Sequence, residues 1–321
     1  MSDLSHERGA APARMRAEVI EGLSRPQKEL PSRYFYDARG SALFEEITRQ
    51  PEYYLTRAER ALLERAALEL ACRLRSRTLV ELGAGSAAKT RILLDALRAA
   101  GGADAYVPVD VSGEFLAVTA HELRADYPGL TVIPVVADFT AELHLPNELP
   151  SPRLVAFLGS TLGNFDDTAA VALLSRVAAE LKPQDHFLLG VDLRKDVAVL
   201  EAAYDDARGV TAEFNRNLLR VVNRQIGTDF DVDAFRHCAF YDRERHRIEM
   251  HLVAERPLTV HVPGAADVRF AAGESVRTEI SCKYSLESVA RLLEAAGLRL
   301  DVWTPDAEGH YALALASSAD G

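Results

Sequence analysis

Apolar and polar residues follow two rhythms along the chain, and between residues 78 and 193 these rhythms alternate. Short apolar runs are typical of buried strands. They are separated by segments whose apolar residues recur every three or four positions, as in helices that bury one face. The apolar runs predict strands at residues 78–83, 105–112, 131–139, 153–160 and 185–193. Strands that alternate with helices predict an α/β fold with a parallel, doubly wound sheet and right-handed crossovers.

Residues 195–285 interrupt this alternation. They contain a predicted helical stretch at 199–225, followed by predicted antiparallel strands such as 245–255 and 258–262. The first pattern then returns with a helix that Ser285 caps and Gly297 ends, followed by two strands.

The interruption predicts two domains. One consists of residues 60–194 plus 286–321 and is built on the doubly wound sheet. The other is an α+β domain of residues 1–59 plus 195–285.

Charge and composition limit the possible partners. The 321 residues carry a formal net charge of -11, and an acidic surface repels phosphate backbones, so we expect no nucleic-acid substrate. No apolar run approaches the length of a membrane span, and the N-terminus has no apolar core of a signal peptide, so we expect a cytoplasmic protein that binds no membrane. The three cysteines are far apart and the histidines lack metal-ligand spacing, so we expect neither disulfides nor a metal.

The segment VELGAGSAAKT joins the first predicted strand to the helix that follows. Its glycines, Gly83 and Gly85, permit a sharp turn and let a ligand approach the main chain closely. Two cofactor classes use such a loop: nicotinamide dinucleotides and S-adenosylmethionine. A dinucleotide-binding loop has the form G-x-G-x-x-G, and here Ala88 occupies the third glycine position, which is a less common variant.

Acidic residues at the ends of the next two strands favour the second class. Asp110 can accept hydrogen bonds from both hydroxyls of a ribose. Asp138 followed by Phe139 suits an adenine, because a carboxylate can accept from the exocyclic amine and a ring can stack on the base. This series is more typical of methyltransferases that use S-adenosylmethionine than of nicotinamide-dependent enzymes.

The fourth strand runs into a loop of small polar residues, GSTLGNFDD. In a doubly wound sheet the first and fourth strands are neighbours, and ligands bind outside their carboxyl ends. Gly159 and Asn164 are therefore expected near the reactive end of the cofactor, where Asn164 offers both a donor and an acceptor.

Five blocks of the sequence together resemble the histidine-specific Nα-methyltransferases, which form trimethylhistidine (hercynine) in the first step of ergothioneine biosynthesis. The blocks are YFYDARGSALFEEIT-x-x-PEYYLTR, LVELGAGSAAKTR, VAFLGSTLGNF, YDDARGVTAEFNRN and TEISCKY, spread over residues 34–284. The resemblance implies a Rossmann-like class I methyltransferase sheet and a substrate-binding domain formed by the N-terminal segment and the insertion. It also implies an S-adenosylmethionine-dependent trimethylation of the α-amine of L-histidine.

The resemblance further implies individual roles. The S-adenosylmethionine site, including the loop glycines, would consist of Gly83, Gly85, Lys89, Asp110, Asp138 and Phe139. Asn164 and Tyr204, with the Gly159 backbone, would meet the amine and carboxylate of histidine, and Tyr36 would act with Asn164 in catalysis. The imidazole would be held by Tyr53, Glu279 and Ser281, and the pocket would be shaped by Phe44, Thr211 and Met250.

Three alternatives remain open on the sequence alone. The first is an Nα-methyltransferase for another amino acid, such as tryptophan, although a Glu/Ser pair is of little use to an indole. The second is a nicotinamide-dependent oxidoreductase. The third is a non-catalytic ligand-binding protein. We also expect a monomer whose partner is a small molecule.

Overall fold

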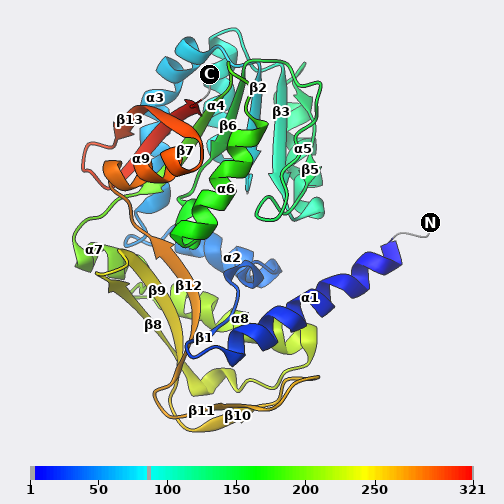
Figure 1. The fold of residues 1–321 in the computed structure, drawn as a ribbon, viewed down its shortest axis with the longest axis vertical. Coiled ribbons are helices and arrows are strands. Elements are labelled where there is room, and N and C mark those ends of the chain that lie inside the picture. The colour runs from blue at the N-terminus through cyan, green and yellow to red at the C-terminus, as the bar shows by residue number, and fades with distance from the viewer. Residues whose placement is uncertain (1–3, 85–87, 320–321) are drawn as a thin grey trace. The chain divides into compact units, whose positions relative to one another are not determined.

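The computed structural model describes residues 4–84 and 88–319, and the chain divides into two compact units (Figure 1). The first, here called the insert unit, comprises Met1–Tyr54 and Lys195–Ser281. The second, here called the sheet unit, comprises Leu55–Arg194 and Cys282–Gly321. The boundary predicted after residue 59 lies inside a single continuous helix, so the division falls before that helix instead.

The sheet unit contains one mixed sheet with the strand order β13-β14-β7-β6-β2-β3-β4, and β5 also pairs with β3. Its strands from β2 to β7 are parallel, and β14 is antiparallel to both of its neighbours. The bounds are β2 Thr78–Leu82, β3 Ala105–Asp110, β4 Thr131–Val132, β5 Val135–Val136, β6 Arg153–Phe157, β7 His186–Asp192, β13 Leu298–Pro305 and β14 Tyr311–Ser318. The predicted doubly wound α/β sheet is confirmed.

One predicted strand is divided in two. The stretch 131–139 forms β4 and β5, which pair with the two ends of β3 and are separated by Ile133 and Pro134. Proline has no N–H to donate to a sheet, which accounts for the break.

Helices cover the sheet on both faces (Figure 1). They are α3 Leu55–Leu74, α4 Ala88–Ala99, α5 Gly113–Asp126, α6 Asp167–Glu180 and α9 Leu286–Ala295, with a short 3₁₀ turn η2 at Thr161–Asn164. Helix α3 packs on α4, and α6 packs on α9. As predicted, Ser285 caps α9, in a capping box with Ser288, and Gly297 follows its end with a φ of 79°.

The insert unit contains a four-stranded sheet of order β1-β12-β9-β8 and a separate β10-β11 pair. The strands are β1 Lys28–Glu29, β8 Phe235–Asp242, β9 Arg247–Ala254, β10 Leu258–Val260, β11 Val268–Phe270 and β12 Ser275–Cys282. The helices are α1 Leu4–Ser24, η1 Ser32–Phe35, α2 Ala38–Ile47, α7 Val197–Ala202, α8 Val210–Ile226 and η3 Val232–Ala234. Helix α8 packs against β8 and β9.

The predicted helical stretch 199–225 is in fact two helices. Gly209, with a φ of 71°, ends the connection between α7 and α8. The Asp206 carboxylate accepts hydrogen bonds from the Val210 and Thr211 N–H groups, at 2.9 and 2.7 Å, and so caps the start of α8.

Candidate functional site

The predicted cofactor residues of the sheet unit lie at the carboxyl ends of neighbouring parallel strands. Gly83 follows β2 with a φ of 68° and donates its N–H to the Val109 carbonyl at 2.8 Å. A Cβ at Gly83 would lie 3.9 Å from the Phe139 ring, so glycine keeps the space beside this ring open. Phe139 in turn packs edge-on against Phe157 at the end of β6. Gly85 lies outside the described residues.

The two predicted acids stand on turns that fix their carboxylates. Asp110 is the last residue of β3 and accepts from the Ser112 N–H at 3.0 Å. Asp138 follows β5 and accepts from both the N–H and the hydroxyl of Thr140. Each carboxylate is held from the protein side and is only partly buried. These groups fit an adenosine ligand, because they combine an open backbone turn, an aromatic ring and two carboxylates that accept hydrogen bonds.

The loop after β6 has an unusual backbone. Gly159 and Ser160 both have positive φ values, 80° and 55°. A left-handed serine is strained, and here its hydroxyl accepts from the Asp192 N–H at 2.9 Å. The turn ends in η2, which places Asn164 at the end of the loop.

A buried acid that the sequence reasoning overlooked lies beneath this loop. Glu59, on α3, is 1% exposed. One of its oxygens accepts from the Gly159 N–H at 2.7 Å and from the Tyr311 hydroxyl at 2.8 Å, and the other pairs with Lys89 at 2.6 Å. An acidic residue at a buried position of an amphipathic helix was the available signal. Lys89, predicted as a cofactor residue, is thus paired within the protein.

Glu81, the acid of the glycine loop, points into the core. Tyr106 donates to it at 2.7 Å and Thr90 also donates to it. Burial, only partly offset by these hydrogen bonds, raises the pKa of Glu81. Its role is therefore to anchor β2 and the start of α4.

The predicted pocket residues of the insert unit include a cluster of aromatic rings. Tyr36 and Phe44 meet edge to face with centroids 5.8 Å apart, Phe44 meets Tyr53 at 6.2 Å, and Tyr53 meets Tyr204 at 6.3 Å. Phe214 of α8, which was not predicted, is buried and lies within 5.8 and 6.1 Å of Tyr36 and Phe44.

Glycine at position 40 lets the first turn of α2 lie close to the Phe35 backbone. A Cβ at Gly40 would lie 1.7 Å from the Phe35 carbonyl oxygen. Asp37 is the N-cap of α2, and its carboxylate accepts from the Gly40 N–H and from Asn217 of α8, the latter at 2.8 Å. The N-terminal segment is thereby fixed to α8.

Polar groups border the aromatic rings. The Tyr204 hydroxyl and the Ser281 hydroxyl share a hydrogen bond of 2.8 Å. Burial, and then the charges of Glu279 and Tyr204, raise the pKa of Tyr36, so its hydroxyl is protonated at neutral pH.

Thr211 and Met250 are both buried, at 3% and 1% exposure. The Thr211 hydroxyl makes no hydrogen bond of good geometry among the described residues. The hydroxyl lies beside the Asp206 carboxylate, and together with the Thr211 backbone N–H it lowers the pKa of Asp206 against the effect of burial.

The sequence matches a family described as histidine-specific, S-adenosylmethionine-dependent methyltransferase over residues 15–318. The chain belongs to this family. It is 47% identical to the histidine N-alpha-methyltransferase of Mycobacterium tuberculosis, with 94% of each chain covered. It is 30% identical to ergothioneine biosynthesis protein 1 of Schizosaccharomyces pombe, over 88% of this chain and 38% of that one. A solved S-adenosylmethionine-dependent methyltransferase from Clostridium acetobutylicum shares the fold, with a TM-score of 0.50, 14% identity, and 86% and 97% of the two chains covered.

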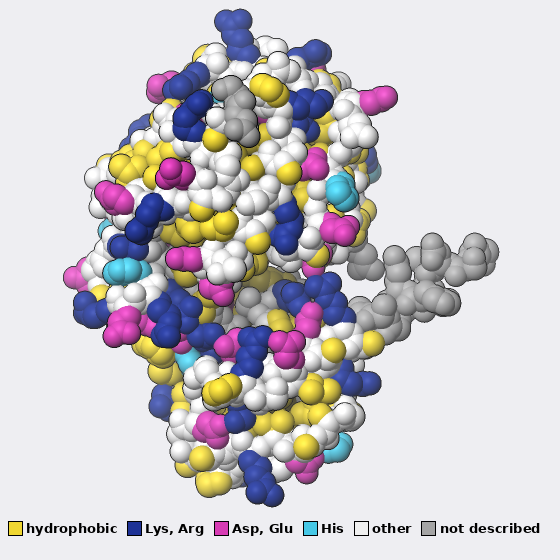
Figure 2. All heavy atoms as spheres, in the orientation of Figure 1, with side chains coloured by type: hydrophobic (Ala, Val, Ile, Leu, Met, Phe, Trp, Pro, Cys, Tyr) yellow, Lys and Arg dark blue, Asp and Glu magenta, His cyan; other side chains and the backbone are white. Residues whose placement is uncertain are grey.

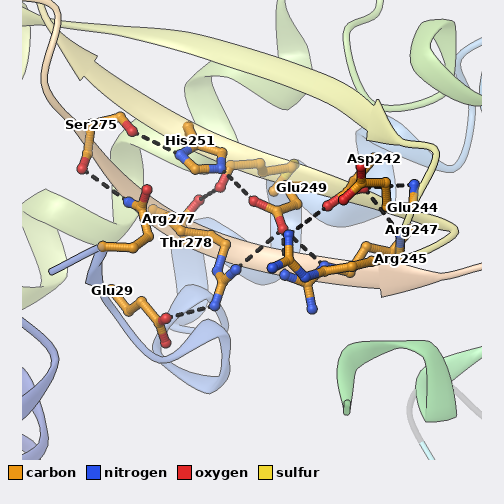
Figure 3. A network of polar contacts seen from close by, with 12 residues as sticks. Glu29, Asp242, Glu244, Arg245, Arg247, Glu249, His251, Ser275, Arg277 and Thr278 are labelled. Atoms are coloured by element: carbon orange, nitrogen blue, oxygen red, sulfur yellow. Dashed lines mark hydrogen bonds and ion pairs between the residues drawn. The ribbon is translucent and has the colours of Figure 1, made fainter. Parts of the chain in front are cut away.

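A polar network on the sheet of the insert unit stabilises the strands of this histidine-specific methyltransferase (Figure 3). Glu249 accepts from His251 at 2.9 Å, from the Arg247 Nε at 2.8 Å and from Arg277 at 3.2 Å. Arg277 also pairs with Glu29 of β1 at 2.5 Å. Burial alone would raise the pKa of Glu249, but its hydrogen bonds to His251 and Arg247 lower it to about 2. The network joins β1, β12 and β9.

Charged side chains of both signs intermingle on the face drawn in Figure 2. Such a surface does not present a continuous basic stripe for a nucleic acid. Within the described ranges, no group of three or more His, Cys, Asp or Glu could hold a metal ion, and no helix is long and apolar enough to span a membrane.

Proposed function

We propose that this protein transfers three methyl groups from S-adenosylmethionine to the α-amine of L-histidine and so produces hercynine for ergothioneine biosynthesis. The observation that carries the proposal is the hydrogen-bonded pair of Tyr204 and Ser281, beside Glu279 and the aromatic cluster, in a chain of the histidine-specific family. Glu279 can accept from an imidazole N–H, and a hydroxyl can donate or accept.

The methyl donor would be held by the strand-end loops of the sheet unit. Asp110 would accept from the ribose hydroxyls, Asp138 would accept from the adenine amine, and the Phe139 ring would stack on the base. Gly83 leaves the main chain accessible beside that ring. S-Adenosylmethionine itself supplies an electrophilic methyl group on a sulfonium and leaves as S-adenosylhomocysteine, so the reaction we propose uses no metal.

The substrate would be recognised at both of its ends. Asn164 and the Gly159 backbone, with Tyr204, would orient the α-amine and carboxylate, while Tyr53 would help to hold the imidazole. Phe44, Thr211 and Met250 would shape the pocket. A site built to pair with a polar ring rejects analogues that lack its hydrogen-bonding groups, because its own groups are then left unpaired.

The α-amine must lose a proton before it can attack. Deprotonation at pH 7 costs roughly 2–3 kcal/mol for an amine that titrates above neutrality. Holding two reactants in line contributes about 7–11 kcal/mol, so orientation outweighs the acid–base contribution. Because the pKa of Tyr36 is raised, its neutral hydroxyl would orient the amine and pass a proton to water rather than act as a phenolate base.

The aromatic cluster also suits the end product. The faces of Tyr36, Phe44 and Tyr53 could tolerate the growing, finally quaternary ammonium through cation–π attraction, which contributes about 0.5–2 kcal/mol. Successive transfers to one substrate need such tolerance.

Titration calorimetry of the full chain separates the alternatives. We expect S-adenosylhomocysteine to bind, and histidine to bind in its presence at micromolar concentration, with no heat from tryptophan. Tryptophan binding in place of histidine would favour the amino-acid alternative. Binding of NADH without S-adenosylhomocysteine would favour an oxidoreductase. Sedimentation of the same sample tests the expected monomer.

A further inference from the structure

Glu59 occupies a position that connects the start of α4 to the loop after β6. It is buried on α3, and its carboxylate contacts Lys89, at the start of α4, and Gly159, directly after β6. Strands β2 and β6 are paired in parallel, so these contacts lie at the carboxyl ends of the central strands, where doubly wound sheets bind ligands.

The surrounding chain is shaped to hold this carboxylate. Tyr311 of β14 donates to the same oxygen that Gly159 uses. A Cβ at Gly190 of β7 would lie 2.3 Å from that oxygen, so any larger residue at this position would clash with the Glu59 carboxylate. A carboxylate held by three donors, from α4, the loop after β6 and β14, is far more ordered than a surface ion pair.

Charge is the property that Glu59 contributes. With Glu59 ionised, its pair with Lys89 is formally neutral. Without it, Lys89 loses its ion-pair partner and keeps only a longer-range attraction to Glu81, and its ammonium lies 3.2 Å from the position that a Cβ of Gly159 would take. A cation at that point repels a second cation over short distances in a partly buried site.

The cofactor changes charge in the reaction. The methyl donor carries a sulfonium, whereas the product carries an uncharged thioether. A neutral Glu59–Lys89 pair lets the site bind the positively charged sulfonium more tightly than the thioether. A Lys89 without Glu59 would weaken binding of the sulfonium.

We propose that Glu59 is a positioning residue that neutralises Lys89 and anchors the Gly159 loop, so that the methyl-donor site prefers the sulfonium over the thioether. This inference rests on the proposed function. Its consequence is that the spent cofactor leaves more readily before each following transfer.

The test uses two unreactive ligands that differ by one positive charge near the reacting centre, sinefungin and S-adenosylhomocysteine. Calorimetry gives the ratio of their dissociation constants. We expect Glu59→Gln, which keeps the shape and removes the charge, to lower the preference for sinefungin by roughly tenfold. Lys89→Gln, which leaves Glu59 unpaired, should shift the preference in the opposite direction.

Two controls separate charge from packing. Tyr311→Phe removes one donor to Glu59 without changing any charge, and it should leave the ratio within threefold of wild type. The double variant Glu59→Gln/Lys89→Gln restores neutrality and should restore the ratio even if both affinities fall. If Glu59→Gln does not fold, the Lys89→Gln and double variants test the same claim.

Equal weakening of both ligands in Glu59→Gln, or a shift of the same sign in Lys89→Gln, would overturn the proposal and leave a purely structural role. If wild-type protein bound neither ligand, the proposed function would fail instead. These two failures are therefore distinguishable.

Discussion

The two units present their candidate binding residues in contrasting ways. In the sheet unit the residues lie on loops that follow parallel strands, and backbone conformation matters most: Gly83, Gly159 and Ser160 all have positive φ values. In the insert unit the residues are side chains that come from α2, from β12 and from the turns between elements, and their rings and hydroxyls contact one another. A ligand that many enzymes share can be bound by a common backbone geometry, whereas a particular substrate needs particular side chains. Changes at the glycine turn and the acidic strand ends of the sheet unit should therefore affect the methyl donor, and changes in the insert unit should affect the choice of amino acid.

The largest expected effect comes from filling the glycine turn. Gly83→Leu would project a side chain into the space beside Phe139, and we expect S-adenosylhomocysteine affinity to fall at least about 100-fold, or roughly 2.7 kcal/mol. Gly101→Leu is the matched control. Gly101 also has a positive φ, 81°, but an added Cβ would meet no atom within 4 Å. Equal losses in both variants would attribute the effect to backbone strain rather than to the site.

Removing the imidazole partner should affect the substrate alone. We expect Glu279→Gln to lower kcat/KM for histidine roughly 100-fold, because a polar site loses its discriminating charge. The affinity for S-adenosylhomocysteine should change less than threefold. Glu255→Gln, at an exposed position of the same unit, serves as the charge control. A comparable loss of cofactor affinity in Glu279→Gln would contradict the division of roles.

The Tyr36 hydroxyl offers a finer test. Since its pKa is raised above the ordinary value of 10, it does not ionise between pH 7 and 9, and the rise of kcat/KM with pH should follow the substrate amine alone. We expect Tyr36→Phe to lower kcat/KM by about tenfold at every pH in this range. Tyr34→Phe, whose hydroxyl donates to Glu18 instead, is the control. A deficit that disappears at high pH would show that the hydroxyl only passes on the proton and does not orient the amine.

The smallest expected effect is on stability and tests whether the insert unit depends on its polar network. The pKa of Glu249 is about 2 in the folded chain and 4.5 as the ordinary value, so its contribution is present above pH 4.5 and is lost as the pH falls towards 2. Allowing for solvent screening, we expect the free energy of unfolding to fall by about 1 kcal/mol between pH 5 and 3.

Urea unfolding at a series of pH values measures this loss. Glu249→Gln should be less stable at pH 5 and should show a weaker dependence on pH over the same interval. An identical pH dependence in the variant would mean that other carboxylates account for the acid sensitivity.

The sequence was most informative where structure depends on local pattern. Apolar periodicity located the strands and helices of the sheet unit, and the Ser285 cap and Gly297 stop are observed. Pattern was less informative where one residue divides an element, as Pro134 separates β4 from β5.

Residues that matter through tertiary contacts could not be located in this way. Glu59 is separated by 100 residues from Gly159 and by 252 from Tyr311, and nothing local to α3 shows that they meet. Phe214 could not be located from local pattern either, because its contacts with the other aromatic rings depend on the packing of α2 and η1 on α8. The aromatic and Glu/Ser positions were available only through the resemblance of several blocks taken together.

Mass spectrometry of a reaction containing the full chain, L-histidine and S-adenosylmethionine tests the central claim most directly. We predict three successive mass increases of one methyl group each, with all three methyl groups on the α-nitrogen, and no product from tryptophan. Absence of transfer to histidine, methylation of the imidazole ring, or efficient methylation of tryptophan would contradict the account.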